Sequence, residues 1–296
     1  MTYLNRIKLA DKSDEDGFVL TYPYQLEMQC YSHTNIYPFK IFPQKGLESI
    51  EFSPITIFYG GNGSGKSTLL NIISEKLKLE RSAPFNDTPY MVSYLEFCQY
   101  ELAPRIEKIP HGSKIITSDD VFDFLLDIRA INEGVDRRRE ALFDEYTDAV
   151  DTPMRPLRSL EEFDDFKRRS EAKRSTKSKY VTKRLGSLEL DGKSNGESAF
   201  LYFTRKIGEN ALYLLDEPEN SLSAELQIKL VKFIEDSARF YGCQFVISTH
   251  SPFLLSMKGA KIYDLDSNPV APKPWTELGN VRVYYDFFKQ HMEDFD

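Results

Sequence analysis

The segment Ile55-Thr56-Ile57-Phe58-Tyr59-Gly60-Gly61-Asn62-Gly63-Ser64-Gly65-Lys66-Ser67 decides the fold of this chain. Its first five residues form a short apolar run, which is typical of a strand covered on both faces in a parallel sheet. A glycine-rich loop follows at once, and residues 68–73 continue with helical character. This order of strand, loop and helix predicts an α/β architecture with a largely parallel sheet.

The loop matches the pattern G-x-x-x-x-G-K-[ST] of phosphate-binding loops. Its glycines let backbone N–H groups point inward at phosphate oxygens, and the helix that follows adds the positive end of its dipole. We expect Lys66 to contact the β- and γ-phosphates of ATP and the hydroxyl of Ser67 to bind Mg²⁺. The predicted nucleotide-binding residues here are Gly60, Gly61, Asn62, Gly63, Ser64, Gly65, Lys66, Ser67 and Thr68. The alternative is a glycine turn that merely joins strand to helix.

Two more apolar runs, residues 211–215 and 244–248, are predicted to be strands, and residues 223–240 between them to be a helix. The first run ends in Asp216 and Glu217. Next to a phosphate loop, these acids suit Mg²⁺-dependent chemistry. We expect Asp216 to orient the ion and Glu217 to polarise the attacking water as general base. The alternative is that both acids simply begin a solvated turn.

The rest of the chain is predicted to surround this core. Residues 1–58 have a β-rich composition, with candidate strands at 17–22 and 37–42, and another strand is predicted at 91–95. Residues 113–185 are dense in charge and are predicted to form helices inserted into the fold. The predicted fold class is an α/β P-loop NTPase with an N-terminal antiparallel β part and a helical insert, within a single domain of residues 1–296.

Three further strings resemble motifs of the ABC-type ATPases. Residues 193–198, Lys-Ser-Asn-Gly-Glu-Ser, resemble the signature that usually reads Leu-Ser-Gly-Gly-Gln, although lysine replaces the leading leucine. Residues 221–223 resemble the D-loop, and residues 248–252, Ser-Thr-His-Ser-Pro, contain a candidate switch histidine, His250. The resemblance implies that the signature contacts the γ-phosphate held by a second subunit. Its candidate nucleotide-binding residues are Ser194, Gly196 and Glu197.

The resemblance also implies a glutamine in the Mg²⁺ shell, and Gln99 is the candidate because it follows the predicted strand at 91–95. His250 is expected to bond the γ-phosphate or the attacking water. Asp-Glu-Pro-Glu-x-x-Leu, followed by Ser-Thr-His-Ser-Pro, is similar to soluble ATPases related to SMC, recombination-repair and OLD-type proteins. Such proteins imply an ATP-hydrolysing switch that works as a head-to-tail homodimer and drives an effector protein or nucleic acid, often in DNA maintenance or antiphage defence.

Composition sets bounds on location and partners. No apolar run approaches the length of a membrane span, so no direct membrane insertion is expected, and three scattered cysteines predict neither disulfides nor a zinc site. We interpret the chain as cytoplasmic. The net charge of −8 argues against a basic surface over the whole molecule. A local cluster of nine basic residues between Lys167 and Arg184 indicates either nucleic-acid contact or a solvated helix.

The C-terminal aromatic stripe of Tyr284, Phe287, Phe288 and Met292 is expected to dock on its own domain, with partner binding as the alternative. Tyr37 and Phe39 are candidates to stack on adenine. Two competing functions remain at this point. The chain can be the nucleotide-binding subunit of a membrane ABC transporter, which predicts co-purification with a membrane partner. It can also be a P-loop kinase, a class that has no use for Ser194 or His250.

Overall fold

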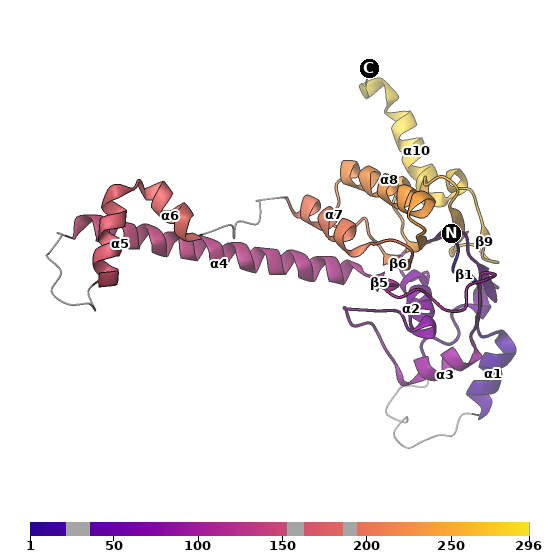
Figure 1. Ribbon diagram of the computed structural model, residues 1–296. Helices are drawn as coiled ribbons and strands as arrows, with labels where there is room; N and C mark the ends of the chain where they lie inside the picture. Colours follow the sequence, from indigo (N-terminus) through magenta and orange to yellow (C-terminus); the bar gives the residue numbers. More distant parts are fainter. Residues whose placement is uncertain (22–35, 153–162, 186–193, 296) are drawn as a thin grey trace. The chain divides into compact units, whose positions relative to one another are not determined.

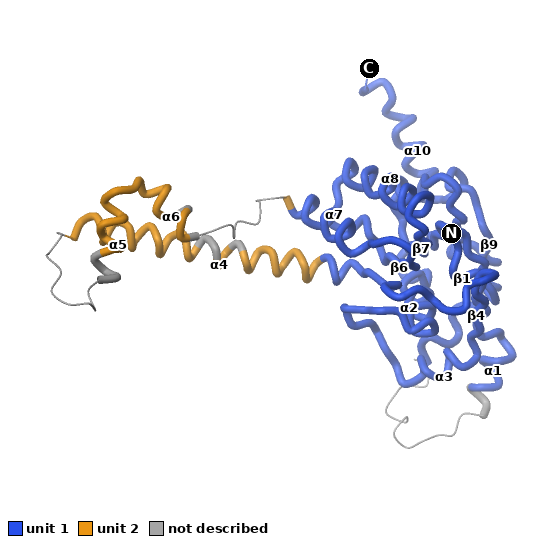
Figure 2. The backbone as a smooth tube through the Cα atoms, viewed as in Figure 1, with its two compact units in different colours: residues 1–121, 195–296 blue, residues 122–194 orange. Residues whose placement is uncertain are grey.

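The computed structural model describes residues 1–21, 36–152, 163–185 and 194–295 and contains two compact units (Figures 1 and 2). Unit 1 comprises residues 1–121 and 195–296, and unit 2 comprises residues 122–194. The inserted part therefore begins later than the predicted residue 113. The reason is that Lys114–Ile116 form strand β5 of the main sheet in unit 1.

Unit 1 holds a sheet in which the described strands follow the order β5-β6-β7-β3-β8-β9. Besides β5, its strands are β3 (Ile55–Tyr59), β6 (Leu212–Asp216), β7 (Gln244–Ser248), β8 (Lys261–Asp264) and β9 (Ala271–Pro272). In this sheet β5, β6, β7, β3 and β8 run parallel to one another, and β9 is antiparallel to β8. All residues of β3 and β7 are buried, which explains their short apolar runs. The predicted parallel core is confirmed.

A separate antiparallel sheet has the order β2-β1-β4, formed by β1 (Leu4–Lys8), β2 (Ser49–Glu51) and β4 (Gln99–Leu102). It confirms the predicted antiparallel β part. Gln244, fully buried at the start of β7, links the two sheets: its Oε1 accepts hydrogen bonds from the backbone N–H groups of Tyr3 (2.7 Å) and Leu4 (2.9 Å). One apolar core, which includes Ile7 and Phe58, extends across both sheets.

The helices of unit 1 pack on this framework. They are α1 (Lys12–Thr21), α2 (Lys66–Leu77), α3 (Pro89–Phe97), α7 (Asn195–Lys206), α8 (Ala224–Phe240), α9 (Pro252–Leu255) and α10 (Gly279–Gln290). Helix α2 contacts β5, β6 and β7. Helix α8 begins where predicted: Ser223 caps it by accepting a hydrogen bond from the N–H of Leu226, and Leu230 and Ile234 are fully buried.

Three strand predictions were wrong. Residues 17–21 belong to α1, and the predicted strand's last residue, Tyr22, lies outside the described residues. Residues 37–42 form turns that lead into a 3₁₀ turn at Pro43–Lys45. The segment at 91–95 is part of α3, because Pro89 opens a helix whose buried face contains Tyr90, Met91 and Tyr94.

Unit 2 is built from helices. Most of α4 (Ser118–Asp151) lies in it, together with α5 (Phe163–Arg174) and α6 (Lys177–Leu185). Its small core contains Leu142, Ala172 and Tyr180, and Arg184 pairs with both Glu145 and Glu171. Arg184, a member of the predicted basic cluster, therefore forms ion pairs within its own unit. The helical character of the insert is confirmed.

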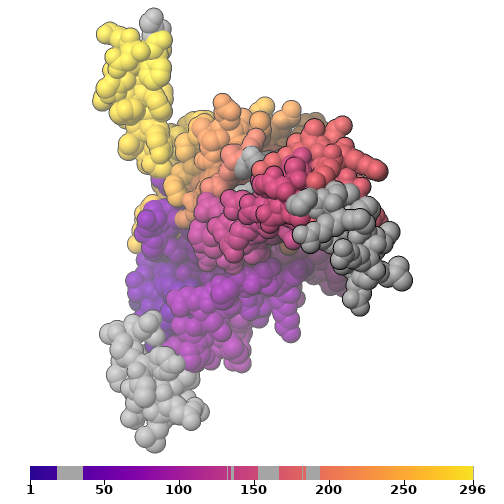
Figure 3. Space-filling model, turned by 90° about the vertical axis from the view of Figure 1, so that its left-hand side faces the viewer, coloured from indigo at the N-terminus to yellow at the C-terminus, as the bar shows by residue number. Residues whose placement is uncertain are grey.

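The C-terminal stripe does not dock on its own domain. In α10 and the 3₁₀ turn Met292–Phe295, every residue from Arg282 to Phe295 is exposed, and Figure 3 shows this segment in yellow, standing clear of the neighbouring surface. Phe287 is 55% and Met292 66% exposed. No helix among the described residues is long and apolar enough to cross a membrane.

Candidate nucleotide-binding site

The phosphate loop joins β3 to α2. Gly65 occupies the position before α2 with φ +102°, and an added Cβ there would lie 3.2 Å from the ring of Phe42. At Gly60, a Cβ would lie 2.5 Å from Oγ of Ser64, so both positions need glycine. The hydroxyl of Ser64 is buried and has no hydrogen-bond partner among the described residues. A loop with a free buried donor beside a helix N-terminus fits a phosphate ligand.

Lys66 is the cation of this loop, and its side chain is only 5% exposed. Its Nζ donates hydrogen bonds to the carbonyl oxygens of Gly60 (2.9 Å) and Gly61 (3.2 Å). The same Nζ lies 3.5 Å from Oε1 of Glu217. The ammonium group is therefore held where the loop curves around it, with its charge facing the end of β6.

Two residues outside the motif also hold the loop. Lys45 Nζ donates to the carbonyl oxygens of Ser64 (2.7 Å) and Leu265 (2.8 Å). Asp266 accepts a hydrogen bond of 2.8 Å from the N–H of Gly61. Sequence reasoning missed both, because neither belongs to a recognisable pattern and Asp266 is 205 positions from its partner.

Ser67 and Asp216 form the candidate Mg²⁺ site. Strands β3 and β6 flank β7 in a parallel arrangement, so the loop and the acidic strand end meet at one edge of the sheet. The hydroxyl of Ser67 donates to Oδ1 of Asp216 at 3.1 Å, and Ser248 donates to the same oxygen. Burial raises the pKa of Asp216, although both hydrogen bonds oppose this. A hydroxyl and a carboxylate are oxygen ligands that fit Mg²⁺.

Glu217 is held in a left-handed conformation with φ +48°. Its N–H donates to the carbonyl (3.0 Å) and the hydroxyl (3.2 Å) of Ser248, so the pairing of β6 with β7 fixes this conformation. For a residue other than glycine it costs on the order of 1 kcal/mol or more. The carboxylate of Glu217 lies near two possible partners, because its Oε1 is 3.5 Å from Nζ of Lys66 and 3.9 Å from Nδ1 of His250.

His250 follows β7, and its side chain is 46% exposed. It is positioned by Glu219, whose Oε1 accepts hydrogen bonds from the His250 N–H (3.0 Å) and the Thr249 hydroxyl (2.6 Å). Glu219 is 6% exposed, and burial raises its pKa. Sequence reasoning assigned no role to Glu219, although its place in the motif Asp-Glu-Pro-Glu was a signal that could have found it.

Other predicted residues lie elsewhere. Ser194 is exposed, and Gly196 and Glu197 are in the first turn of α7. A Cβ on Gly196 would lie 2.8 Å from Leu226 and 3.3 Å from the carbonyl oxygen of Ser221, so the signature glycine packs against the segment that resembles the D-loop.

Gln99 and Phe39 do not keep their predicted roles. Gln99 begins β4, faces Lys8 across the antiparallel sheet, and lines a pocket with Arg6 and Glu48. The strand predicted before Gln99 is helix α3, so the prediction of Gln99 as a Mg²⁺ ligand loses the sequence context on which it depended. Phe39 is 3% exposed and stacks on Phe18, which leaves it unable to stack on adenine. Tyr37 stays a candidate, since its hydroxyl donates to Oγ1 of Thr68 at 3.1 Å.

Among the described residues, no cluster of three or more His, Cys, Asp or Glu is arranged to bind a metal by itself. The Ser67 and Asp216 pair does not need one, because Mg²⁺ usually completes its shell with phosphate oxygens and water.

Comparison with known families identifies the chain. Residues 100–256, more than half of the sequence, match the family model described as "AAA domain, putative AbiEii toxin, Type IV TA system". The chain belongs to this AAA family. A second AAA-domain model matches residues 35–75, which include the phosphate loop. The protein is thus an AAA-type P-loop ATPase domain. Comparison with curated proteins finds no match.

Solved structures similar to this AAA-family chain include SMC heads and an ATP-binding cassette. The SMC head domain from Thermotoga maritima is 15% identical, with 92% of this chain and 98% of that chain covered and a TM-score of 0.38. An SMC head with an extended coiled coil, bound to the C-terminal domain of ScpA and derived from Pyrococcus furiosus, is 14% identical, with 97% and 100% covered and a TM-score of 0.43. An ATP-binding cassette bound to ADP and phosphate is 15% identical, with 78% and 90% covered and a TM-score of 0.35.

Proposed function

We propose that this AAA-family protein is a cytoplasmic ATP-hydrolysing switch that closes as a head-to-tail homodimer and drives an effector. The observation that carries the proposal is that Lys66 and His250 both approach Glu217 at one edge of the sheet. Oε1 of Glu217 lies 3.5 Å from Nζ of Lys66 and 3.9 Å from Nδ1 of His250. An acid and a histidine beside a phosphate-loop lysine suit hydrolysis of a phosphoanhydride.

In the proposed reaction, the N–H groups of the loop and Lys66 bind the phosphates of ATP. Ser67 and Asp216 hold Mg²⁺, which neutralises phosphate charge when it is bound. Glu217 accepts the proton of a water molecule whose oxygen attacks the γ-phosphorus. The bond from this phosphorus to the β,γ-bridging oxygen breaks, and ADP and phosphate leave. His250, fixed through its backbone by Glu219, bonds the γ-phosphate or the attacking water.

The second half of the proposed site comes from another copy. Ser194, Gly196 and Glu197 are proposed to contact the γ-phosphate held by the partner subunit. The support for this is the exposure of Ser194 and the packing of Gly196 on residues 221–223. Because a composite site closes around ATP, slow hydrolysis should trap the closed dimer. An antiphage role is proposed on the motif resemblance described above.

The test replaces Glu217 with Gln, which removes the base and keeps the shape. We expect ATP hydrolysis to fall about 100- to 10,000-fold, and ATP with Mg²⁺ to trap a dimer in light scattering. The matched control is Glu225→Gln, since Glu225 is exposed in the first turn of α8. A Glu217→Gln protein that stays monomeric, or that hydrolyses ATP at the wild-type rate, contradicts the proposal.

A further inference from the structure

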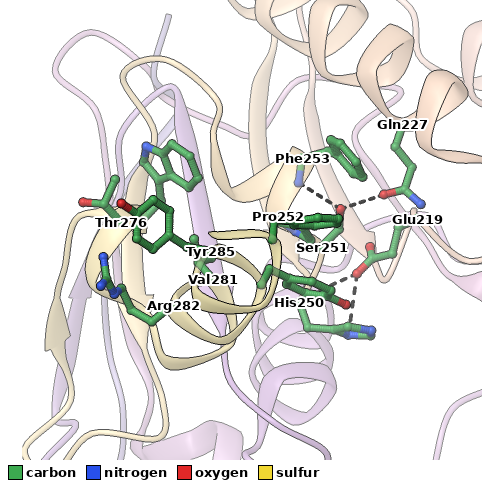
Figure 4. Close-up of a pocket in the computed structure, with 13 residues that line it drawn as sticks. Glu219, Gln227, His250, Ser251, Pro252, Phe253, Thr276, Val281, Arg282 and Tyr285 are labelled. Atoms are coloured by element: carbon green, nitrogen blue, oxygen red, sulfur yellow. Dashed lines mark hydrogen bonds and ion pairs between the residues drawn. The ribbon is translucent and has the colours of Figure 1, made fainter. Parts of the chain in front are cut away.

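A pocket of ≈ 760 Å³ adjoins His250 within unit 1 (Figure 4). One wall is aromatic and is formed by Trp275, Tyr284, Tyr285 and Phe288 of α10 and the 3₁₀ turn before it. The opposite wall is polar and includes Glu219 and Gln227. The reaction proposed above uses none of the aromatic residues, so the pocket needs a separate explanation.

Glu219 contributes a carboxylate oxygen with no partner. Its Oε1 is bonded by Thr249 and His250, but its Oε2 is buried and has no hydrogen-bond partner among the described residues. A buried acceptor without a donor typically costs about 1–3 kcal/mol. Figure 4 shows this side chain beside His250 and Gln227 at the edge of the pocket. A ligand that brings a donor to Glu219 would recover that cost.

The aromatic wall is also arranged to accept a cation. The guanidinium carbon of Arg282 already lies 4.7 Å from the centre of the Tyr285 ring. Arg282 is 3.6 Å from Asp286, which offsets its positive charge. The aromatic side chains around it are half-exposed, with Tyr284 at 44% and Phe288 at 54%. Ring faces of this kind attract guanidinium groups and also bury apolar neighbours.

We propose that this pocket binds a segment of a partner protein, which places an arginine side chain across the aromatic wall and on Glu219. The two walls are complementary to a cation: Oε2 of Glu219, buried and without a partner among the described residues, lies on one side, and aromatic rings lie on the other. Arginine fits better than lysine, since its planar group can stack and donate to a carboxylate at the same time. Apolar residues beside the arginine would cover the exposed face of α10.

The pocket is connected to the nucleotide site through Asn280. Its side chain donates to the carbonyl oxygen of His250 (3.1 Å), and its N–H donates to the hydroxyl of Tyr59 (2.9 Å), the residue before Gly60. A segment bound between α10 and Glu219 therefore acts on both the switch histidine and the start of the phosphate loop. This coupling rests on the proposed ATPase function, whereas binding itself does not.

The test uses Trp275, the one tryptophan in the chain, as a fluorescent reporter inside the pocket. The full chain, without nucleotide, is titrated with a blocked pentapeptide of alanine, leucine, arginine, leucine and alanine. A second peptide carries citrulline, the neutral isostere of arginine. We expect a saturable fluorescence change with the arginine peptide and at least tenfold weaker binding of the citrulline peptide.

Two pairs of variants complete the test. Glu219→Gln should weaken the arginine peptide at least tenfold, whereas Glu225→Gln should leave it unchanged. If Glu219→Gln fails to fold, Tyr284→Ala provides the test, because it should also bind the arginine peptide at least tenfold more weakly than wild type. Its control is Val283→Ala, which is exposed on the same helix but outside the pocket and should bind the peptide as wild type does.

Three outcomes overturn the proposal. They are no saturable response, equal affinity for the two peptides, and a fluorescence change that follows protein concentration without peptide, which means that a second copy fills the pocket. Because the titration contains no ATP, a protein that binds the peptide but hydrolyses nothing refutes the proposed ATPase function and leaves this inference standing.

Discussion

At the scale of the residue, Glu15 shows what burial does to a carboxylate. It lies in α1, is 3% exposed, and accepts a hydrogen bond of 2.8 Å from the N–H of Lys40. Burial raises its pKa from the ordinary 4.5 to about 7, and the hydrogen bond opposes this only in part. The folded chain therefore keeps a proton that the unfolded chain has already released between these two values.

This difference sets the direction of a pH effect. The contribution of Glu15 to the free energy of unfolding is fully present below pH 4.5 and is lost as the pH rises toward about 7. In the wild type the free energy of unfolding should therefore fall by on the order of 1 to 3 kcal/mol between pH 4.5 and pH 7, and in Glu15→Gln this fall should be absent. Urea unfolding at several pH values measures it. An identical pH dependence in the variant and the wild type would show that Glu15 does not titrate in this range.

The site residues that could be predicted from the sequence were those that belong to a recognisable local motif. Lys66, Ser67 and Asp216 come together as the local patterns predicted, because parallel strands bring their carboxyl ends to one edge. Their roles in catalysis stay predictions. Lys45 and Asp266 could not be found this way, since each reaches the loop from a distant segment. Gln99 was misplaced because its only support was a neighbouring strand that is helical.

At the scale of the element, apolar runs bounded by turns predicted β3, β6 and β7 correctly, since buried parallel strands have a distinctive composition. The errors fell on short segments such as α3, where aromatic residues suit a strand and a helix equally. Edge strands such as β5, with three residues, carry too little pattern to predict. Such strands form because they pair with a neighbouring strand in the folded protein, as β5 does with β6.

Two helical glycines lead to opposite predictions. A Cβ at Gly134, inside α4, would meet no atom within 4 Å, so Gly134→Ala should stabilise the helix by about 0.5–1 kcal/mol. At Gly196 the Cβ would lie 2.8 Å from the end of the flexible Leu226 side chain and 3.3 Å from the backbone carbonyl oxygen of Ser221, so Gly196→Ala should forgo the helical gain and destabilise α7 by up to about 1 kcal/mol. Thermal unfolding followed by circular dichroism compares them. A rise in stability for Gly196→Ala contradicts the packing described here.

At the scale of the whole molecule, unit 2 carries the basic cluster between Lys167 and Arg184, for which the sequence allows either nucleic-acid contact or a solvated helix. Lys183 and Arg184 pair with acids of their own unit. Lys167, Arg174 and Lys179 instead line a pocket on α5 and α6. No ion pair with these three side chains is found among the described residues, so they are the ones we expect to contact phosphate if the cluster binds nucleic acid.

Replacing all three with alanine should weaken binding of a 30-base-pair DNA duplex. Each lost phosphate contact should reduce the slope of log K against log salt by about 0.9, up to about 2.7 for the set. Fluorescence anisotropy across a salt series measures both effects. The control removes Lys108, Lys229 and Lys232, which are exposed in unit 1. If the control lowers the slope as much as the test variant, the charge effect is general and unit 2 is not the contact.

The position of β3 in its sheet has a consequence for biosynthesis. This strand is completed at Tyr59, but its two neighbours are β7 and β8, which end at Ser248 and Asp264. During synthesis, about two hundred further residues must therefore leave the ribosome before β3, the strand that leads into the phosphate loop, can pair with a neighbour. A nascent chain stopped before β7 holds the motif without the sheet, and its apolar strand is then a natural target for chaperones.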